Sequence, residues 1–199
     1  MSQVAHWDRQ YVAEEVPWDR SEPATELRRV VEATSASPPG RLLELGCGTG
    51  ADAVWLAGRG FRVTAVDLSH EAVRRARRRA AEAGASVDFR SGDLRDWPML
   101  GGPFDRVYDA GCYGAIRRAD PAGYLRTMEH VTRPGATALI LVGNDWEPET
   151  GSGPPTASAA ALLSEFWRLF DVIHLREFRF DVAADGIAYL GWSCLLRRR

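Results

Sequence analysis

Apolar and polar residues are arranged along most of the chain in two alternating patterns. Short apolar runs bounded by turn residues are typical of buried strands, and apolar residues recurring every three or four positions are typical of amphipathic helices. Several of the helical patterns end at a glycine, a common helix stop. The predicted strands cover 41–45, 61–66, 87–90, 104–108, 136–142, 172–178 and 187–196, and the predicted helices cover 26–33, 51–58, 70–83, 121–130 and 157–170.

Strands that alternate with helices predict a parallel, doubly wound sheet with right-handed crossovers. The last two strands have no helix between them, so we expect them to form an antiparallel hairpin. The predicted fold class is α/β, Rossmann-like and doubly wound, with a mostly parallel seven-stranded sheet. Because 199 residues is about the length of one large domain, we expect a single domain over 1–199. Residues 41–199 form its core, and residues 1–40 form an N-terminal arm.

Composition excludes several function classes. A net charge of −2 gives no general attraction for nucleic acid or anionic membranes. All 25 basic residues are arginine, which removes lysine Schiff-base chemistry and the lysine of a P-loop. The three cysteines and four histidines lack the spacing of a disulfide scaffold or a metal site, so we predict no metal. No apolar run has transmembrane length and no signal peptide begins the chain, so we expect a cytoplasmic monomer.

The most informative motif follows the first predicted strand. It reads Glu44-Leu-Gly46-Cys47-Gly48-Thr-Gly50 and leads directly into the predicted helix 51–58. Glycines allow a close approach between backbone and ligand, and a helix start offers unpaired N–H groups. Two sites fit this pattern: the dinucleotide fingerprint of nicotinamide oxidoreductases, and the Glu-x-Gly-x-Gly-x-Gly motif of S-adenosylmethionine-dependent methyltransferases.

Two acidic residues further along the chain bear on this choice. Asp67 ends the second predicted strand, where a ribose-binding carboxylate is expected in both kinds of site. Asp93 and Leu94 follow the third predicted strand, which in methyltransferases is the usual place of a contact with the adenine amino group. Together with the C-terminal hairpin and the lack of a separate catalytic domain, they favour the methyltransferase interpretation.

These motifs resemble those of class I S-adenosylmethionine-dependent methyltransferases, and more narrowly the small thiopurine and tellurite methyltransferase-like enzymes. The resemblance extends over nearly the whole chain. Its further markers are His6-Trp-Asp8, Pro17-Trp-Asp19, Ala65-Val-Asp-Leu-Ser69, Phe104-Asp-Arg-Val-Tyr-Asp-Ala-Gly-Cys-Tyr113, Arg133-Pro-Gly135, Gly153-Pro-Pro155 and Ser193-Cys-Leu-Leu-Arg-Arg198.

The resemblance implies S-adenosyl-L-methionine as the cofactor and S-adenosyl-L-homocysteine as the product. It also implies that the arm folds over the cofactor, so that Trp7 and Trp18 exclude water beside the methionine part. A hydrophobic anchor of the arm on the core is the alternative for these two residues. The predicted cofactor-binding residues are Trp7, Trp18, Glu44, Gly46, Cys47, Gly48, Gly50, Asp67, Leu68, Asp93, Leu94 and Asp109.

In the family, the stretch from Asp109 to Tyr113 lies beside the methyl group, so we predict these two residues as catalytic. Many relatives read Asp-Arg-Gly-Cys-Phe-His here. In this chain Ala110 replaces the arginine and Gly114 replaces the histidine, and a further family arginine falls on Pro121. These departures leave no obvious general base.

The missing histidine favours an acceptor that ionises easily, because a thiol needs less help than an alcohol near neutral pH. We therefore predict methyl transfer to a small-molecule thiol or another soft nucleophile. The alternatives are an O- or N-methyltransferase of secondary metabolism, or a non-methylating relative that binds S-adenosylmethionine. An arginine cluster on the predicted helix 70–83 fits a solvent face better than a nucleic-acid patch, because no aromatic residues interleave it: Arg74, Arg75, Arg77, Arg78 and Arg79.

Overall fold

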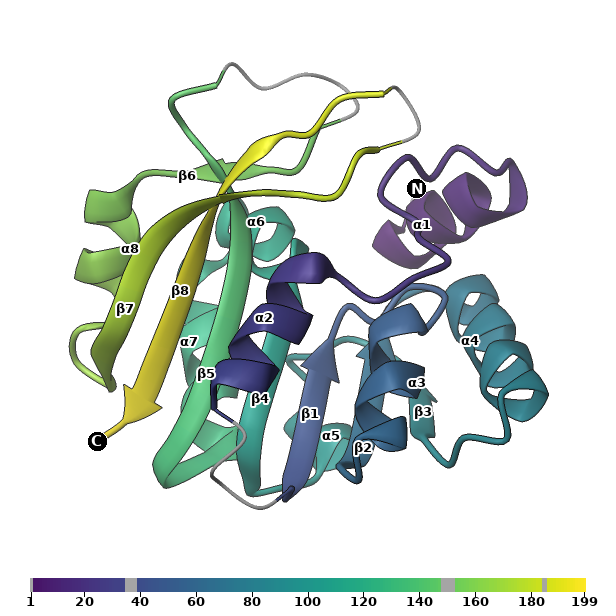
Figure 1. Cartoon of the computed structure of the whole chain (residues 1–199), viewed down its shortest axis with the longest axis horizontal. Coiled ribbons are helices and arrows are strands. Elements are labelled where there is room, and N and C mark those ends of the chain that lie inside the picture. The colour runs from purple at the N-terminus through teal and green to yellow at the C-terminus, as the bar shows by residue number, and fades with distance from the viewer. Residues whose placement is uncertain (1, 35–38, 148–152, 184–185) are drawn as a thin grey trace.

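All described strands belong to one twisted sheet with helices on both faces (Figure 1). The computed structural model describes residues 2–34, 39–147, 153–183 and 186–199. The strands are β1 (Arg41–Leu45), β2 (Arg62–Asp67), β3 (Asp88–Ser91), β4 (Phe104–Ala110), β5 (Thr132–Asn144), β6 (Thr156–Ala157), β7 (Phe170–Arg179) and β8 (Leu190–Arg198). Their order is β3-β2-β1-β4-β5-β8-β7, with β6 pairing beside the end of β5.

The helices are α1 (Gln3–Val12), α2 (Thr25–Ala33), α3 (Ala51–Gly58), α4 (His70–Glu82), α5 (Trp97–Leu100), α6 (Cys112–Arg117), α7 (Pro121–Val131) and α8 (Ala159–Phe166). The predicted fold class is confirmed: β3, β2, β1, β4 and β5 are parallel, and β7 and β8 form the antiparallel C-terminal hairpin. The seven predicted strands are present, and the two-residue β6 is an eighth.

Four elements were not predicted from the sequence: α1, α5, α6 and β6. The helix predicted over 157–170 is shorter than expected. Residue 157 belongs to β6, the cap Ser158 accepts a hydrogen bond from the Ala161 N–H at 3.0 Å, and β7 already begins at Phe170. The predicted loop before this helix lies partly at 148–152, outside the described residues.

The core lies on both faces of the sheet, because the central strands are apolar on both sides. On one face, Leu43 and Leu45 of β1 share a buried cluster with residues of α5, α6, α7 and α8. On the other face, Leu42 of the same strand packs with residues of α2, α3 and α4. Since Leu27 and Val30 of α2 are buried in this second cluster, residues 25–33 belong to the core. The part of the predicted arm that lies outside the core therefore ends near residue 24.

Parallel strands end at one edge of the sheet, and open α/β sheets bind ligands there. In Figure 1 this carboxyl edge is at the top, with α1 above the side of β1 and β2. The glycine motif, Asp67 and Asp109 all lie at this edge. Among the described helices, none has the length and apolar character that a membrane span requires.

Candidate active site

The glycine motif forms a tight loop between β1 and α3. Gly46, Gly48 and Gly50 have φ angles of 70°, 51° and 81°, in the left-handed region that glycine adopts without strain. A Cβ on Gly46 would lie 2.7 Å from the Cβ of Cys112, and a Cβ on Gly50 would lie 2.9 Å from that of Ala76. The loop therefore requires glycine both for its backbone angles and for its close packing against α6 and α4.

Asp67 is held beside this loop by backbone donors. Its carboxylate accepts hydrogen bonds from the N–H of Gly48 at 2.8 Å and from the N–H of Ser69 at 2.9 Å. These two bonds fix the orientation of the side chain at the end of β2, next to Leu68. Burial raises the pKa of Asp67 despite these hydrogen bonds.

Glu44 is the least satisfied acid in this region. Its side chain is buried, and its Oε2 atom has no hydrogen-bond partner among the described residues. Burial, followed by the neighbouring charge of Asp52, raises the pKa of Glu44 well above its usual value. A buried acceptor without a donor is rare in proteins and calls for a ligand or water that supplies one.

The acidic residues at this edge repel one another electrostatically. Asp52, Asp67 and Asp109 all raise the pKa of Glu44, and Arg20 is the neighbouring cation that opposes them. A ligand that carries positive charge would relieve this repulsion. S-adenosylmethionine carries a sulfonium and an ammonium group, so its charge suits the acids gathered at this end of β1, β2 and β4.

Asp109 and Tyr113 meet at the start of α6. The Asp109 carboxylate accepts hydrogen bonds from the N–H of Tyr113 and from the hydroxyl of Tyr124, both at 2.9 Å. Asp109 is fully buried, and burial raises its pKa to about 7. Such a carboxyl group exchanges protons near neutral pH, in keeping with its predicted role.

The Tyr113 hydroxyl has a different partner. It donates to Glu165 of α8 at 2.7 Å and accepts from the Nε of Arg117 at 3.2 Å. Burial and the Glu165 carboxylate raise the pKa of Tyr113. These contacts suit a side chain that positions α6 against α8, whereas the catalytic role of Tyr113 stays a prediction.

Gly114, where the resemblance leads us to expect a histidine, packs closely against Pro155. A Cβ at this glycine would lie 3.0 Å from both the Cβ and the carbonyl oxygen of Pro155. The other departure, Pro121, is the first residue of α7, and the carboxylate of Asp120 caps this helix by accepting from the Gly123 N–H at 2.8 Å. Both departures are therefore built into the local packing.

Asp93 and Leu94 follow β3 as predicted. The Asp93 carboxylate forms an ion pair with Arg95 and also accepts from its backbone N–H at 2.9 Å. Leu94 is buried, and its carbonyl oxygen accepts from the hydroxyl of Thr127 at 3.2 Å. Their contact with adenine stays a prediction.

The arm lies over the glycine loop. Trp7 and Trp18 pack edge to face, with 5.7 Å between ring centroids, and the indole N–H of Trp18 donates to the Tyr11 hydroxyl at 3.3 Å. Tyr11 is 3% exposed, and a Cβ on Gly48 would lie 3.1 Å from its hydroxyl oxygen. Sequence reasoning missed Tyr11, although its position one helical turn after Trp7 places both on one face of α1.

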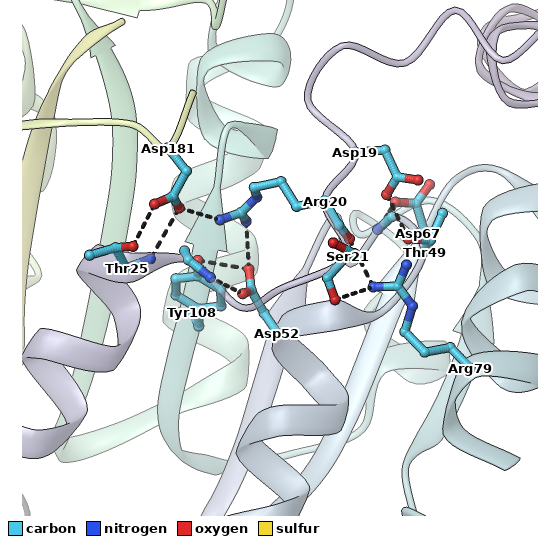
Figure 2. A network of polar contacts seen from close by, with 12 residues as sticks. Asp19, Arg20, Ser21, Thr25, Thr49, Asp52, Asp67, Arg79, Tyr108 and Asp181 are labelled. Carbon is cyan, nitrogen blue, oxygen red and sulfur yellow. Dashed lines mark hydrogen bonds and ion pairs between the residues drawn. The ribbon is translucent and has the colours of Figure 1, made fainter. Parts of the chain in front are cut away.

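Polar contacts attach the arm to the rest of the protein, and Figure 2 shows several of them. Asp19 accepts from the Thr49 hydroxyl of the glycine loop at 2.6 Å. Arg20 bridges Asp52 of α3 at 2.9 Å and Asp181 of the β7–β8 connection at 3.1 Å. Because Asp52 is buried, removing Arg20 would leave a buried carboxylate without its cation.

The arginine cluster of α4 takes part in this attachment. Arg75 donates to the backbone carbonyl of Tyr11 at 2.7 Å, and Arg79 donates to that of Arg20 at 2.8 Å. The prediction that the cluster is only a solvent face is wrong for these two arginines, because their long side chains reach the arm. Three other residues of α4 are buried towards the sheet, as predicted: Val73, Ala76 and Ala80.

Comparison with known proteins agrees with this geometry. The family model of thiopurine S-methyltransferase matches residues 2–183. The chain belongs to the thiopurine S-methyltransferase family. Similar proteins include the 2-heptyl-1-hydroxyquinolin-4(1H)-one methyltransferase of Mycobacteroides abscessus, which is 27% identical over 81% of this chain and 73% of its own length. The probable thiol methyltransferase 2 of Arabidopsis thaliana is 29% identical over 75% of this chain and 65% of its own length.

A solved structure resembles the fold over nearly its full length. It is described as "Conversion of a Disulfide Bond into a Thioacetal Group during Echinomycin Biosynthesis", with a TM-score of 0.83, 26% identity, and coverage of 99% of this chain and 92% of that one. As a member of the thiopurine S-methyltransferase family, the protein whose sequence is printed above is an S-adenosylmethionine-dependent methyltransferase. Membership of this family argues against the two alternatives, a nicotinamide oxidoreductase and a non-methylating binding protein.

The residues present fit the cofactor. The tight glycine loop, the backbone-held Asp67 and the unsatisfied oxygen of buried Glu44 are the features that a cationic nucleoside ligand requires. The individual residues that contact it remain predictions. When bound, S-adenosylmethionine supplies a methyl group already activated by a positively charged sulfur.

Proposed function

We propose that this methyltransferase acts on sulfur in a small molecule, most simply on a thiol. The proposal is supported by α6, where Gly114 lies close to Pro155 at the position where the resemblance leads us to expect a histidine. The four histidines of the chain lie on α1, α4, α7 and β7, so none is on α6 or in the turn before it. An acceptor that ionises without an enzyme base suits this arrangement.

The protein then contributes mainly by positioning. Its arm covers the glycine loop, which excludes water from the reacting atoms, and its sheet edge holds the acceptor in line with the methyl group. Alignment of this kind can lower a barrier by about 7–11 kcal/mol. A thiol of ordinary pKa, about 8.5, is partly ionised near neutral pH and needs little further activation.

Two of the similar proteins support sulfur chemistry. The Arabidopsis relative is named as a probable thiol methyltransferase, and the similar solved structure concerns a reaction at a disulfide. Both similarities extend over most of this chain. They support a sulfur acceptor as the class of substrate without identifying the molecule.

Methylation of oxygen is the second candidate. The relative from M. abscessus is named for a 1-hydroxyquinolone, whose hydroxyl group is bonded to a ring nitrogen. Such a hydroxyl is more acidic than an alcohol, so it also ionises without a strong base. The two candidates therefore share one requirement, an acceptor that loses its proton easily.

We also propose that the enzyme works as a cytoplasmic monomer on a free small molecule rather than on nucleic acid. The arginine cluster of α4 supports this view, because Arg75 and Arg79 are occupied by the arm and Arg74 is paired with Glu71. A net charge of −2 supports it as well.

The test is the pH dependence of methylation for aryl thiols of different pKa, each at subsaturating concentration. Without an enzyme base, the midpoint of kcat/KM against pH follows the pKa of each thiol. A midpoint that stays fixed near 7 for all thiols would contradict the proposal and identify Asp109 as the base, which Asp109→Asn would then remove. Methylation of hydroxyls with no transfer to any thiol would establish the oxygen candidate.

A further inference from the structure

The end of β5 carries a buried donor without an acceptor. β5 continues for three residues beyond Leu141, its last partner of β4, and ends at Asn144. The Asn144 side chain is fully buried and its Oδ1 accepts from the N–H of Trp146 at 2.9 Å. Its Nδ2 group has no partner among the described residues.

A second unpartnered donor lies on the neighbouring strand. Trp192 of β8 pairs with Val142 of β5, two residues before Asn144. Its ring is 7% exposed, and its Nε1–H is buried without an acceptor among the described residues. Because side chains alternate along a strand, Val142 and Asn144 face the same side of the sheet as Trp192.

Trp146 contacts both residues that carry these donors. Its ring meets that of Trp192 edge to face, with 5.7 Å between centroids, yet it is 71% exposed. The turn that carries it is fixed to the hairpin by Glu147, which accepts from the Leu190 N–H at 2.7 Å and pairs with Arg179 at 3.3 Å. An exposed aromatic ring thus lies next to two residues with buried, unpaired N–H donors.

These three residues lie at the same sheet edge as the cofactor loop and Asp109. Ala110, which follows Asp109, pairs with Leu141, and the N–H of Gly111 donates to the Leu141 carbonyl at 2.9 Å. Asn144 therefore extends this edge by about 10 Å, since a strand rises about 3.3 Å per residue. That length is the size of a fused-ring acceptor.

We propose that Asn144, Trp146 and Trp192 form an acceptor subsite, which rests on the proposed function. The Asn144 amide and the Trp192 indole N–H donate to a carbonyl or similar oxygen of the acceptor, and its flat ring lies against Trp146. Leaving a buried donor unpaired is costly, so a ligand that supplies the missing oxygen gains affinity over one that does not. Among acceptors, this subsite selects those that place a carbonyl-type oxygen beside a flat ring.

Two thiols that differ in a carbonyl oxygen test this subsite. Meta-acetylthiophenol has the carbonyl oxygen and meta-ethylthiophenol lacks it. At saturating cofactor and a pH above both thiol pKa values, we expect kcat/KM to favour the acetyl compound about tenfold or more. In Trp192→Phe, which removes the N–H but keeps an aromatic ring, the preference falls to about twofold or less. Asn144→Leu gives the same loss of preference for the acetyl compound.

Two alanine substitutions at exposed tryptophans test the role of Trp146. Trp146→Ala lowers kcat/KM for both thiols alike, whereas Trp167→Ala, at an exposed tryptophan following α8, leaves both unchanged. The proposal is overturned if wild type shows no preference for the acetyl compound. It is also overturned if the preference persists in folded Trp192→Phe and Asn144→Leu, as it would where an internal water satisfies both donors.

Binding of the two methylated products, the corresponding thioethers, tests the preference for the acetyl group without the methyl-transfer step. Calorimetry in the presence of S-adenosylhomocysteine measures their affinities for wild type and Trp192→Phe. A preference for the acetyl thioether that Trp192→Phe removes supports the subsite even if neither thiol is methylated. That result would refute sulfur as the methylated atom while leaving the acceptor subsite in place.

Discussion

The two halves of the carboxyl edge differ in the kind of polar group that each leaves unpaired. On the cofactor side, Asp67 accepts two backbone hydrogen bonds and several polar contacts attach the arm, but buried Glu44 has an acceptor oxygen without a donor among the described residues. On the acceptor side, Asn144 and Trp192 keep buried donors without partners next to an exposed Trp146. The unpaired acceptor of the first half suits the cationic S-adenosylmethionine. In our proposal the unpaired donors of the second half bind the methyl acceptor, and the names of the similar proteins show that acceptors differ between relatives.

Removing the arm tests whether the cofactor half needs its cover. Deletion of residues 2–18 keeps Arg20 with Asp52 and removes only one buried side chain of α1, that of Tyr11. We expect turnover to fall by at least about 100-fold, because water enters and alignment is lost. Circular dichroism should show an unchanged fold. Full activity of the folded, shortened protein would mean that Trp7, Tyr11 and Trp18 have no part in catalysis.

Asp67→Ala acts on the cofactor half alone. Loss of hydrogen bonds to a charged partner typically costs about 1.5–3 kcal/mol, so the Kd for S-adenosylmethionine should rise about 10- to 150-fold in calorimetry. Asp171→Ala is the matched control, because Asp171 pairs with Arg199 on the exposed side of β7. Unchanged cofactor affinity in Asp67→Ala would rule out the ribose contact.

Asp109 stands where the two halves meet, and its ionisation gives a pH-dependent test. Its folded pKa of about 7 is above the ordinary value for aspartate, so its contribution to stability is full below pH 4 and is lost as the pH rises through 7. Asp109→Asn stays neutral. Relative to wild type, its Tm should therefore gain about 3 °C or more between pH 5 and pH 8. A difference in Tm that does not change with pH would mean that Asp109 is not held as a neutral acid.

The smallest effect is expected at the arginines of α4. Arg79→Ala removes one attachment of the arm, so the Kd for the cofactor should rise by about two- to fivefold, as the loss of a single hydrogen bond predicts. Arg78 pairs only weakly with Glu82 on the exposed face, at 3.9 Å, and Arg78→Ala is the control. Equal affinities in the two variants would show that this attachment does not hold the arm closed.

The sequence predicts most of the core, because the central strands are short apolar runs ended by glycines. β1 and α3 have the predicted bounds, and Ser69 caps α4 by accepting a hydrogen bond from the Ala72 N–H at 3.1 Å. The helix α6 is missed because its six residues are too few for a helical period. The helix α1 is missed because its apolar residues lie among charged ones and only Tyr11 is buried.

The acceptor half could not be predicted in the same way. Asn144 and Trp192 are 48 positions apart in the chain, and only the pairing of β5 with β8 brings them together. Likewise, Arg20 pairs with Asp52, although the sequence around neither residue indicates that the two meet. The glycine motif, in contrast, is local, so its spacing alone indicates the kind of ligand.

The contacts between α4 and the arm have a consequence for how this enzyme can change. Arg75 and Arg79 bind the carbonyl oxygens of Tyr11 and Arg20, which belong to the main chain rather than to side chains. Every amino acid carries such a carbonyl, so side chains of the arm that make no polar contact with the rest of the protein can be exchanged while these two anchors remain. Libraries that vary Trp7 and Trp18 and keep Asp19 and Arg20 can therefore alter the volume that the arm encloses without rebuilding its attachment.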